Sequence, residues 1–151
     1  MTIAVELETR IASPPADVFA ELVAIERFPQ WLIASGIIGV ERLDGGPPAA
    51  GSRVRISQRV AGRSTVLDGS ITVFEPDRAL GLQGRDPDGV TIEIEATLVP
   101  DDAGSRLRWS LRIGLPIRFL MFESMIAPQA RRAVALDLEA FRRRVEAGAP
   151  G

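Results

Sequence analysis

The sequence predicts an α+β fold in which a curved antiparallel sheet of seven strands wraps around one long C-terminal helix, with two short helices between the first and second strands. Three observations support this prediction. Apolar and polar residues alternate in seven segments, as they do in strands that bury only one face. Prolines and helical spacing replace the alternation over residues 12–31. Apolar residues then recur every three or four positions over residues 116–146.

The beginning of the chain predicts one strand followed by the two short helices. Residues 2–11 alternate between aliphatic and polar side chains and form the strand. Ser13 is suited to cap a helix, and Pro14 can occupy the first helical turn without the loss of a hydrogen bond. Pro29 disfavours helical geometry at the residue before it, so a second short helix forms around Trp31. We expect Trp31 to act as an apolar plug where the chain turns into the second strand.

The middle of the chain predicts six further strands. They cover residues 37–43, 53–60, 65–74, 79–84, 90–98 and 106–113, separated by loops and turns rich in Gly, Pro and Asp. The polar face of the sheet carries charges of both signs, namely Glu6, Glu8, Glu93 and Glu95 opposite Arg106, Arg108 and Arg112. Such cross-strand pairs contribute about 0.2–1 kcal/mol each. We interpret them as surface pairs and not as a site.

The last predicted element is a helix over residues 116–146, which Pro116 starts and Pro128 bends. Its apolar stripe consists of Phe119, Phe122, Ile126, Ala130, Val134, Leu138, Phe141 and Val145. No other element is long enough to cover the apolar face of the sheet. Because a twisted sheet curves away from a helix along part of its length, we expect a cavity between the two, with Pro128 shaping its mouth.

The composition excludes several classes of chemistry. The chain contains no Cys, His, Tyr or Lys, so disulfides, thiolate nucleophiles, Ser-His-Asp triads and lysine Schiff bases are impossible. We expect no cofactor and no metal, because the carboxylates show no calcium-loop spacing. The net charge is −2, which argues against a nucleic-acid partner.

The same survey predicts one cytoplasmic domain over residues 1–151. No apolar run approaches the ~20 residues of a membrane span, and the N-terminus has no basic signal region.

Three polar residues are candidates for chemistry or ligand recognition. Glu123 lies beside the apolar stripe, where a carboxylate removed from water acts as a general acid or base, unless it reaches solvent. Asp68 is a second catalytic candidate, but the alternation in its strand supports either orientation, and we favour the outward one. Gln58 shares an apolar column of its strand, so its amide bonds either a ligand or another part of the protein.

The remaining candidates are apolar. We expect Trp31, Trp109, Phe119, Phe122, Ile126 and Ala130 to line the cavity or to pack in the core beside it. Together with Gln58 and Glu123 they form the predicted ligand-binding set.

Four segments in this order resemble the SRPBCC superfamily, also called START-like or helix-grip proteins, and in particular its polyketide cyclase/dehydrase-like group. They are IASPPADVFAELVAIERFPQW at 11–31, FEPDRALGL at 74–82, GSRLRWSLRIGLP at 104–116 and MIAPQARRAVALDLEAFRRRVE at 125–146. The resemblance implies a helix-grip fold with a deep apolar cavity that binds a polyketide, a lipid or another hydrophobic small molecule.

Fold alone does not choose between the activities of this superfamily. Some members are cyclases or aromatases, and others are non-catalytic carriers, sensors or accessory subunits. The cyclases of this superfamily often use pocket Arg, Tyr or His groups, and this chain has no His and no Tyr. We therefore expect either a cyclase or a carrier or sensor of an apolar metabolite, and we rank a protein-interaction subunit third. We expect a monomer or a homodimer.

Overall fold

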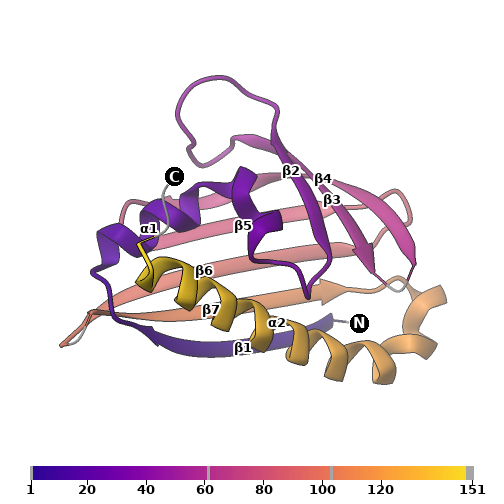
Figure 1. Ribbon diagram of the computed structural model, residues 1–151. Helices are drawn as coiled ribbons and strands as arrows, with labels where there is room; N and C mark the ends of the chain where they lie inside the picture. Colours follow the sequence, from indigo (N-terminus) through magenta and orange to yellow (C-terminus); the bar gives the residue numbers. More distant parts are fainter. Residues whose placement is uncertain (1, 61, 103, 149–151) are drawn as a thin grey trace.

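The computed structural model describes residues 2–60, 62–102 and 104–148, which form a curved sheet and two groups of helices (Figure 1). The strands are β1 (Thr2–Ile11), β2 (Ile37–Arg42), β3 (Arg53–Val60), β4 (Arg63–Glu75), β5 (Ala79–Arg85), β6 (Thr91–Asp101) and β7 (Gly104–Gly114). The helices are α1 (Pro15–Val23), the 3₁₀ helices η1 (Ile25–Gln30) and η2 (Ile117–Phe122), and α2 (Glu123–Glu146). This arrangement confirms the predicted α+β helix-grip fold.

The seven strands form one antiparallel sheet in the order β1-β7-β6-β5-β4-β3-β2. The first strand therefore lies beside the last one, and β2 forms the opposite edge. On the outer, convex face, Arg106 lies 3.2 Å from Glu8 and Arg108 lies 3.5 Å from Glu6. These side chains are exposed, so the predicted surface pairs of Glu6 and Glu8 are confirmed and contribute little to stability.

The start of α1 differs from the prediction that Ser13 caps it. Pro14 is the N-cap residue, with an extended ψ of 155°, and Pro15 occupies the first helical turn. The carbonyl of Ser13 instead accepts a hydrogen bond from the Ser105 hydroxyl at 2.7 Å. The two prolines fix the turn by their restricted backbone, which makes a side-chain cap unnecessary.

The C-terminal segment also differs from the prediction of one helix bent at Pro128. The break lies earlier, where the 3₁₀ helix η2 ends at Phe122 and α2 begins at Glu123. α2 then runs without interruption through Pro128. Pro128 is in the second turn of α2, where its missing N–H removes a single hydrogen bond and the turns on either side remain intact.

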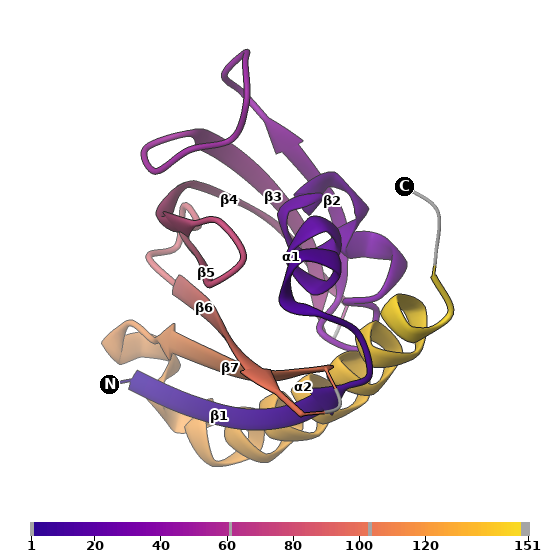
Figure 2. The same cartoon turned by 90° about the vertical axis from the view of Figure 1, so that its left-hand side faces the viewer.

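α2 covers the concave face of the sheet along only half of its own length. Its buried residues are Val134, Asp137, Leu138, Phe141 and Val145, all at the middle of the helix or C-terminal to it. Figure 1 and Figure 2 show the N-terminal half passing beyond the edge that β1 forms. The helix therefore leaves the apolar face uncovered at one end of the sheet. No helix among the described residues is long and apolar enough to cross a membrane.

The middle strands β4 and β5 approach each other closely at a pair of glycines. Gly69 of β4 lies directly opposite Gly84 of β5. A Cβ atom on Gly69 would lie 1.7 Å from the carbonyl oxygen of Gln83, so no other residue fits at this position without movement of β5. The two strands approach each other this closely because neither carries a side chain there.

We predict that Gly69→Ala destabilises the protein by about 3 kcal/mol, because β4 and β5 must separate to admit the methyl group. Urea denaturation measures the change. Gly39→Ala is the matched control, since its nearest neighbour would be the Ser57 Cβ at an ordinary 3.8 Å. We expect the control to change stability by no more than about 0.5 kcal/mol. Equal effects of the two substitutions would refute the close approach of the strands.

Candidate functional site

The half of the interior beneath the C-terminal part of α2 is filled by aromatic rings. The Trp31 ring lies 5.6 Å from Trp109, 4.6 Å from Phe141 and 5.3 Å from Phe28 between ring centroids. Trp31 and Trp109 are only 1% and 2% exposed. Both tryptophans of the predicted ligand-binding set therefore pack in the core. The Trp31 Nε1 is buried and has no hydrogen-bond partner among the described residues.

A buried carboxylate holds α2 against the loop before β2. Asp137 is 3% exposed, and its two oxygens accept hydrogen bonds from the backbone N–H groups of Ala34 and Ser35, each at 2.8 Å. Burial raises the pKa of Asp137, and these hydrogen bonds oppose the rise. Asp137 thus fixes the loop that leads from Trp31 into the sheet.

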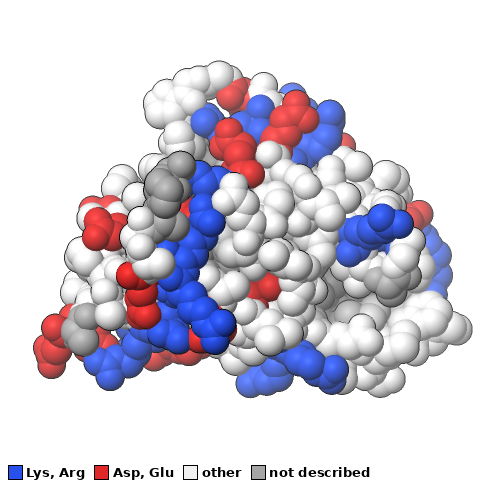
Figure 3. Space-filling view, in the orientation of Figure 1, with Lys and Arg blue, Asp and Glu red and all other residues white. Residues whose placement is uncertain are grey.

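The other half of the interior is open. Around the N-terminal half of α2, the apolar residues that point to the concave side are only half-buried: Ile92, Ile94, Leu111, Ile113, Ile126 and Ala130. We call this region the grip groove. Figure 3 shows the surface hollowed between the start of α2 and the turn that joins β3 to β4. The groove exists because α2 leaves the sheet at this end while the strands continue.

Gln58 lies near this groove but is already bonded. Its Nε2 donates a hydrogen bond to the carbonyl of Ser35 at 3.1 Å, and the residue is half-buried. Of the two partners that the sequence left open for the Gln58 amide, the structure shows another part of the protein. The amide oxygen accepts no hydrogen bond from the described residues and so retains acceptor capacity.

A cluster of charged residues links the ends of the strands to η2. Arg63 binds the carboxylates of Asp86, at 3.1 Å, and of Asp88, while Arg118 lies 3.7 Å from Asp88. The guanidinium carbon of Arg63 lies 5.8 Å from the centroid of the Phe119 ring, and that of Arg118 lies 5.0 Å from it. Both guanidinium groups are therefore close enough to the Phe119 ring for cation–π attraction at the rim of the groove.

Asp86 is the buried member of this cluster. Its pKa is lowered because hydrogen bonds from Val90, Arg63 and Thr65 outweigh burial, which alone would raise it. The carboxylate therefore stays ionised and organises the turn between β5 and β6.

Three other predicted residues lie outside the interior or at its border. Asp68 is on the convex face, with its side chain 70% exposed and 3.2 Å from Arg55, so it has no access to the groove. Phe122 is 42% exposed. Glu123 is half-buried at the first position of α2, with no ion-pair partner among the described residues. Of the predicted residues, Ile126 and Ala130 therefore lie in the groove. Phe119, Phe122 and Glu123 lie at its border. Asp68 lies on the opposite face of the sheet.

Asp137, the Arg63–Asp86 pair and the ion pairs of Glu21 are structurally important polar interactions that the sequence interpretation missed. A signal for Asp137 was present, because it is three residues after Val134 and four before Phe141, both of which belong to the apolar stripe. A carboxylate on that face needs a buried partner. The Arg63–Asp86 pair has no such signal, since its residues are 23 positions apart.

A curved antiparallel sheet wrapped on a C-terminal helix, with a partly open interior, defines the class of helix-grip proteins. The chain belongs to a family described as polyketide cyclase / dehydrase and lipid transport, whose model matches residues 2–146. A comparison with curated proteins gave no match.

Solved structures with the same fold come from several bacteria. The Zhui aromatase/cyclase from Streptomyces sp. R1128 has a TM-score of 0.76 at 19% identity and covers 100% of both chains. The protein TTHA0849 from Thermus thermophilus has a TM-score of 0.75 at 18% identity and covers 97% of this chain and 99% of its own. A START superfamily protein from Mycobacterium smegmatis has a TM-score of 0.72 at 16% identity, covering 98% and 99%. These similarities establish the fold and no particular activity.

We predict that Asp137→Asn alters how stability depends on pH. The folded protein holds the Asp137 proton more tightly than the unfolded chain, where the ordinary pKa is 3.8. The contribution of Asp137 to stability is therefore complete below pH 3.8 and is lost as the pH rises through the folded pKa. The free energy of unfolding of the wild type should fall relative to that of the variant over this range.

Urea denaturation at a series of pH values measures this difference. Asp17→Asn makes the same chemical change at an exposed site of α1 and serves as the control. If the difference in free energy of unfolding between the wild type and Asp137→Asn does not change with pH, burial does not govern the titration of Asp137.

Proposed function

We propose that the protein binds a hydrophobic small molecule, such as a polyketide, a lipid or an aromatic metabolite, in the grip groove and acts as its carrier or sensor. The main support for the proposal is that the helices and aromatic side chains cover only part of the concave face of the sheet. Aromatic rings seal one half, whereas aliphatic side chains in the other half remain half-buried. The family to which the chain belongs includes lipid transport in its description, which supports the proposal.

The exposed apolar surface of the groove favours an apolar ligand. Burial of such surface contributes about 25 cal/mol per Å², so a ligand that covers these side chains gains affinity without any specific polar contact. The polar groups nearby are few. Gln58 already donates to Ser35, and its amide oxygen remains as an acceptor. These features fit a mainly hydrophobic molecule with few polar atoms.

The lack of suitable acid–base groups in the groove favours a carrier over a catalyst. Asp68 is on the other face of the sheet, and Asp86 is engaged with Arg63. A cyclase would depend on Glu123, the half-buried carboxylate at the border of the groove. The fold shared with the Zhui aromatase/cyclase keeps that second function open to test.

We predict that Ala130→Phe blocks the groove and weakens the binding of N-phenyl-1-naphthylamine, an apolar fluorescent probe. The larger side chain occupies space over the half-buried residues, and we expect a loss of about tenfold, equivalent to about 1.4 kcal/mol of binding free energy. A fluorescence titration measures the affinity. Native mass spectrometry of the purified wild type would also reveal a retained ligand.

Ala135→Phe is the matched control, because Ala135 is on the same helix but exposed. It should bind the probe like the wild type. Equal binding by all three proteins would show that the probe does not enter the groove, and the proposed function would then lose its support.

We predict that the protein does not cyclise a linear poly-β-ketone thioester, and that Glu123→Gln leaves binding of the apolar probe unchanged. Product formation can be followed by liquid chromatography and mass spectrometry. If the wild type does turn the substrate over and Glu123→Gln lowers kcat by about 10²-fold with KM unchanged, Glu123 is a general acid or base and the protein is a cyclase.

A further inference from the structure

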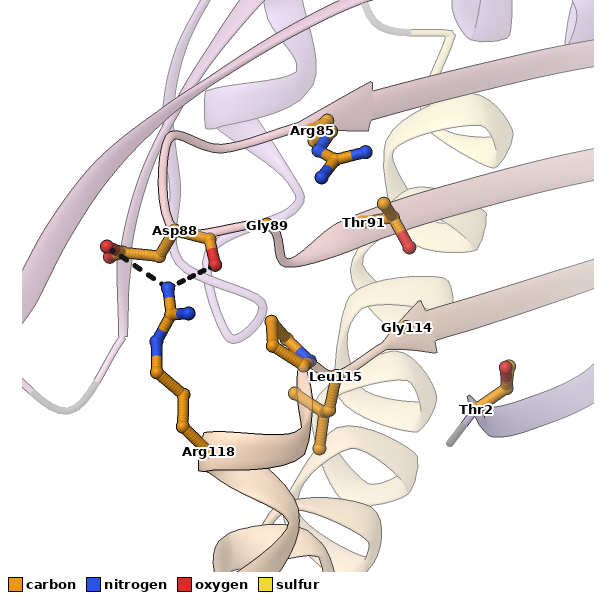
Figure 4. Close-up of a pocket in the computed structure, with 9 residues that line it drawn as sticks. Thr2, Arg85, Asp88, Gly89, Thr91, Gly114, Leu115 and Arg118 are labelled. Carbon is orange, nitrogen blue, oxygen red and sulfur yellow. Dashed lines mark hydrogen bonds and ion pairs between the residues drawn. The ribbon is translucent and has the colours of Figure 1, made fainter.

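The convex face of the sheet carries a hollow of about 370 Å³ that is separate from the grip groove (Figure 4). Its lining comes from the ends of β1, β5, β6 and β7 and from the start of η2: Thr2, Arg85, Asp88, Gly89, Thr91, Gly114, Leu115, Pro116 and Arg118. We propose that this hollow is a binding site for a small oxyanion, the carboxylate or phosphate group of a metabolite, with Arg85 as the residue that recognises its charge.

The site is built by one row of residues across the sheet. Arg85 pairs in register with Thr91, Thr91 with Gly114, and Gly114 with Thr2. All of these side chains are on the same face, so Thr2 and Thr91 flank Gly114, which has no side chain, and Arg85 lies on the far side of Thr91. A Cβ atom on Gly114 would lie 2.2 Å from the Thr91 Oγ1. Glycine at this position therefore leaves room for the Thr91 hydroxyl to lie over β7.

Arg85 is the uncommitted charge of this region. Arg63 and Arg118 are bound to the carboxylates of Asp86 and Asp88, and Figure 4 shows Arg118 joined to Asp88. On the neighbouring strand β4, Asp68 is directly opposite Arg85 in register, but its carboxylate lies 3.2 Å from Arg55 and forms no ion pair with Arg85 among the described residues. Arg85 has no ion pair or side-chain hydrogen bond among the described residues. The neighbouring Arg and Asp side chains thus neutralise one another, and the charge of Arg85 remains beside the hollow.

The chemistry of these groups selects an oxyanion. A guanidinium donates two parallel hydrogen bonds to a carboxylate or phosphate, and threonine hydroxyls supply further donors. The hollow of about 370 Å³ is open to solvent and has room for an oxyanion that is part of a larger molecule. Because the grip groove is on the other face, this inference is independent of the proposed function.

The test is a titration of the full chain with inorganic phosphate and, separately, with acetate, at constant ionic strength because salt screens exposed charges. Two-dimensional ¹H–¹⁵N NMR follows the amide signals of Gly89, Thr91 and Gly114. We expect saturable shifts of these signals. Stronger binding of phosphate would indicate a phosphorylated ligand, and stronger binding of acetate a carboxylic acid.

Two variants and one control make the assignment specific. Arg85→Gln should weaken binding by about tenfold or more, and Thr91→Val, which has the same shape without the hydroxyl, by a smaller factor. Arg53→Gln is the matched control, because Arg53 is exposed on the same face with no ion pair among the described residues. The absence of saturable shifts with either anion, or an equal effect of Arg53→Gln and Arg85→Gln, would overturn the proposal.

Discussion

The packing of three elements around Trp31 is the interaction on which the rest of the structure depends. This ring contacts Phe28 in η1, Trp109 in β7 and Phe141 in α2. Each aromatic pair contributes about 0.5–1.5 kcal/mol beyond the burial of its area. Because these contacts concentrate at one end of the sheet, α2 is firmly attached there and is free to diverge from the strands at the other end. The same cluster that closes half of the interior therefore leaves the grip groove open.

Buried polar groups determine where α2 attaches, in addition to the apolar contacts. Asp137, four residues before Phe141, holds the loop before β2. Glu21 of α1, which is 7% exposed, binds Arg144 of α2 and, at 2.9 Å, Arg27 of η1. Buried ion pairs of this kind add little net stability, since desolvation offsets their attraction. Their effect is on position, because a shift of α2 by one turn would leave Asp137 buried without its partners and would separate Arg144 from Glu21.

Much of the fold could be predicted from the sequence, because alternation and helical spacing report directly on which faces are buried. The limits are local. The alternation in β4 was ambiguous at Asp68 because the register shifts between Ile71 and Val73, so that Leu67 and Phe74 both reach the core. For the candidate site, residue type did not distinguish core from groove. Trp31 and Ile126 belong to equally apolar patterns in the sequence. The direction of α2 relative to the sheet determines that Trp31 is buried and Ile126 is only half-buried.

The open half of the interior links ligand occupancy to stability. Half-buried aliphatic residues in the grip groove forgo part of the burial free energy that a closed core would gain, at about 25 cal/mol per Å². A ligand that fills the groove binds the folded state and not the unfolded chain, so it recovers this free energy and stabilises the protein in proportion to its concentration relative to Kd. The pair of arginines around Phe119 connects η2 to the strand ends at the rim. Occupancy of the groove would therefore also stabilise the segment of the chain that borders it, because η2 continues directly into the free half of α2.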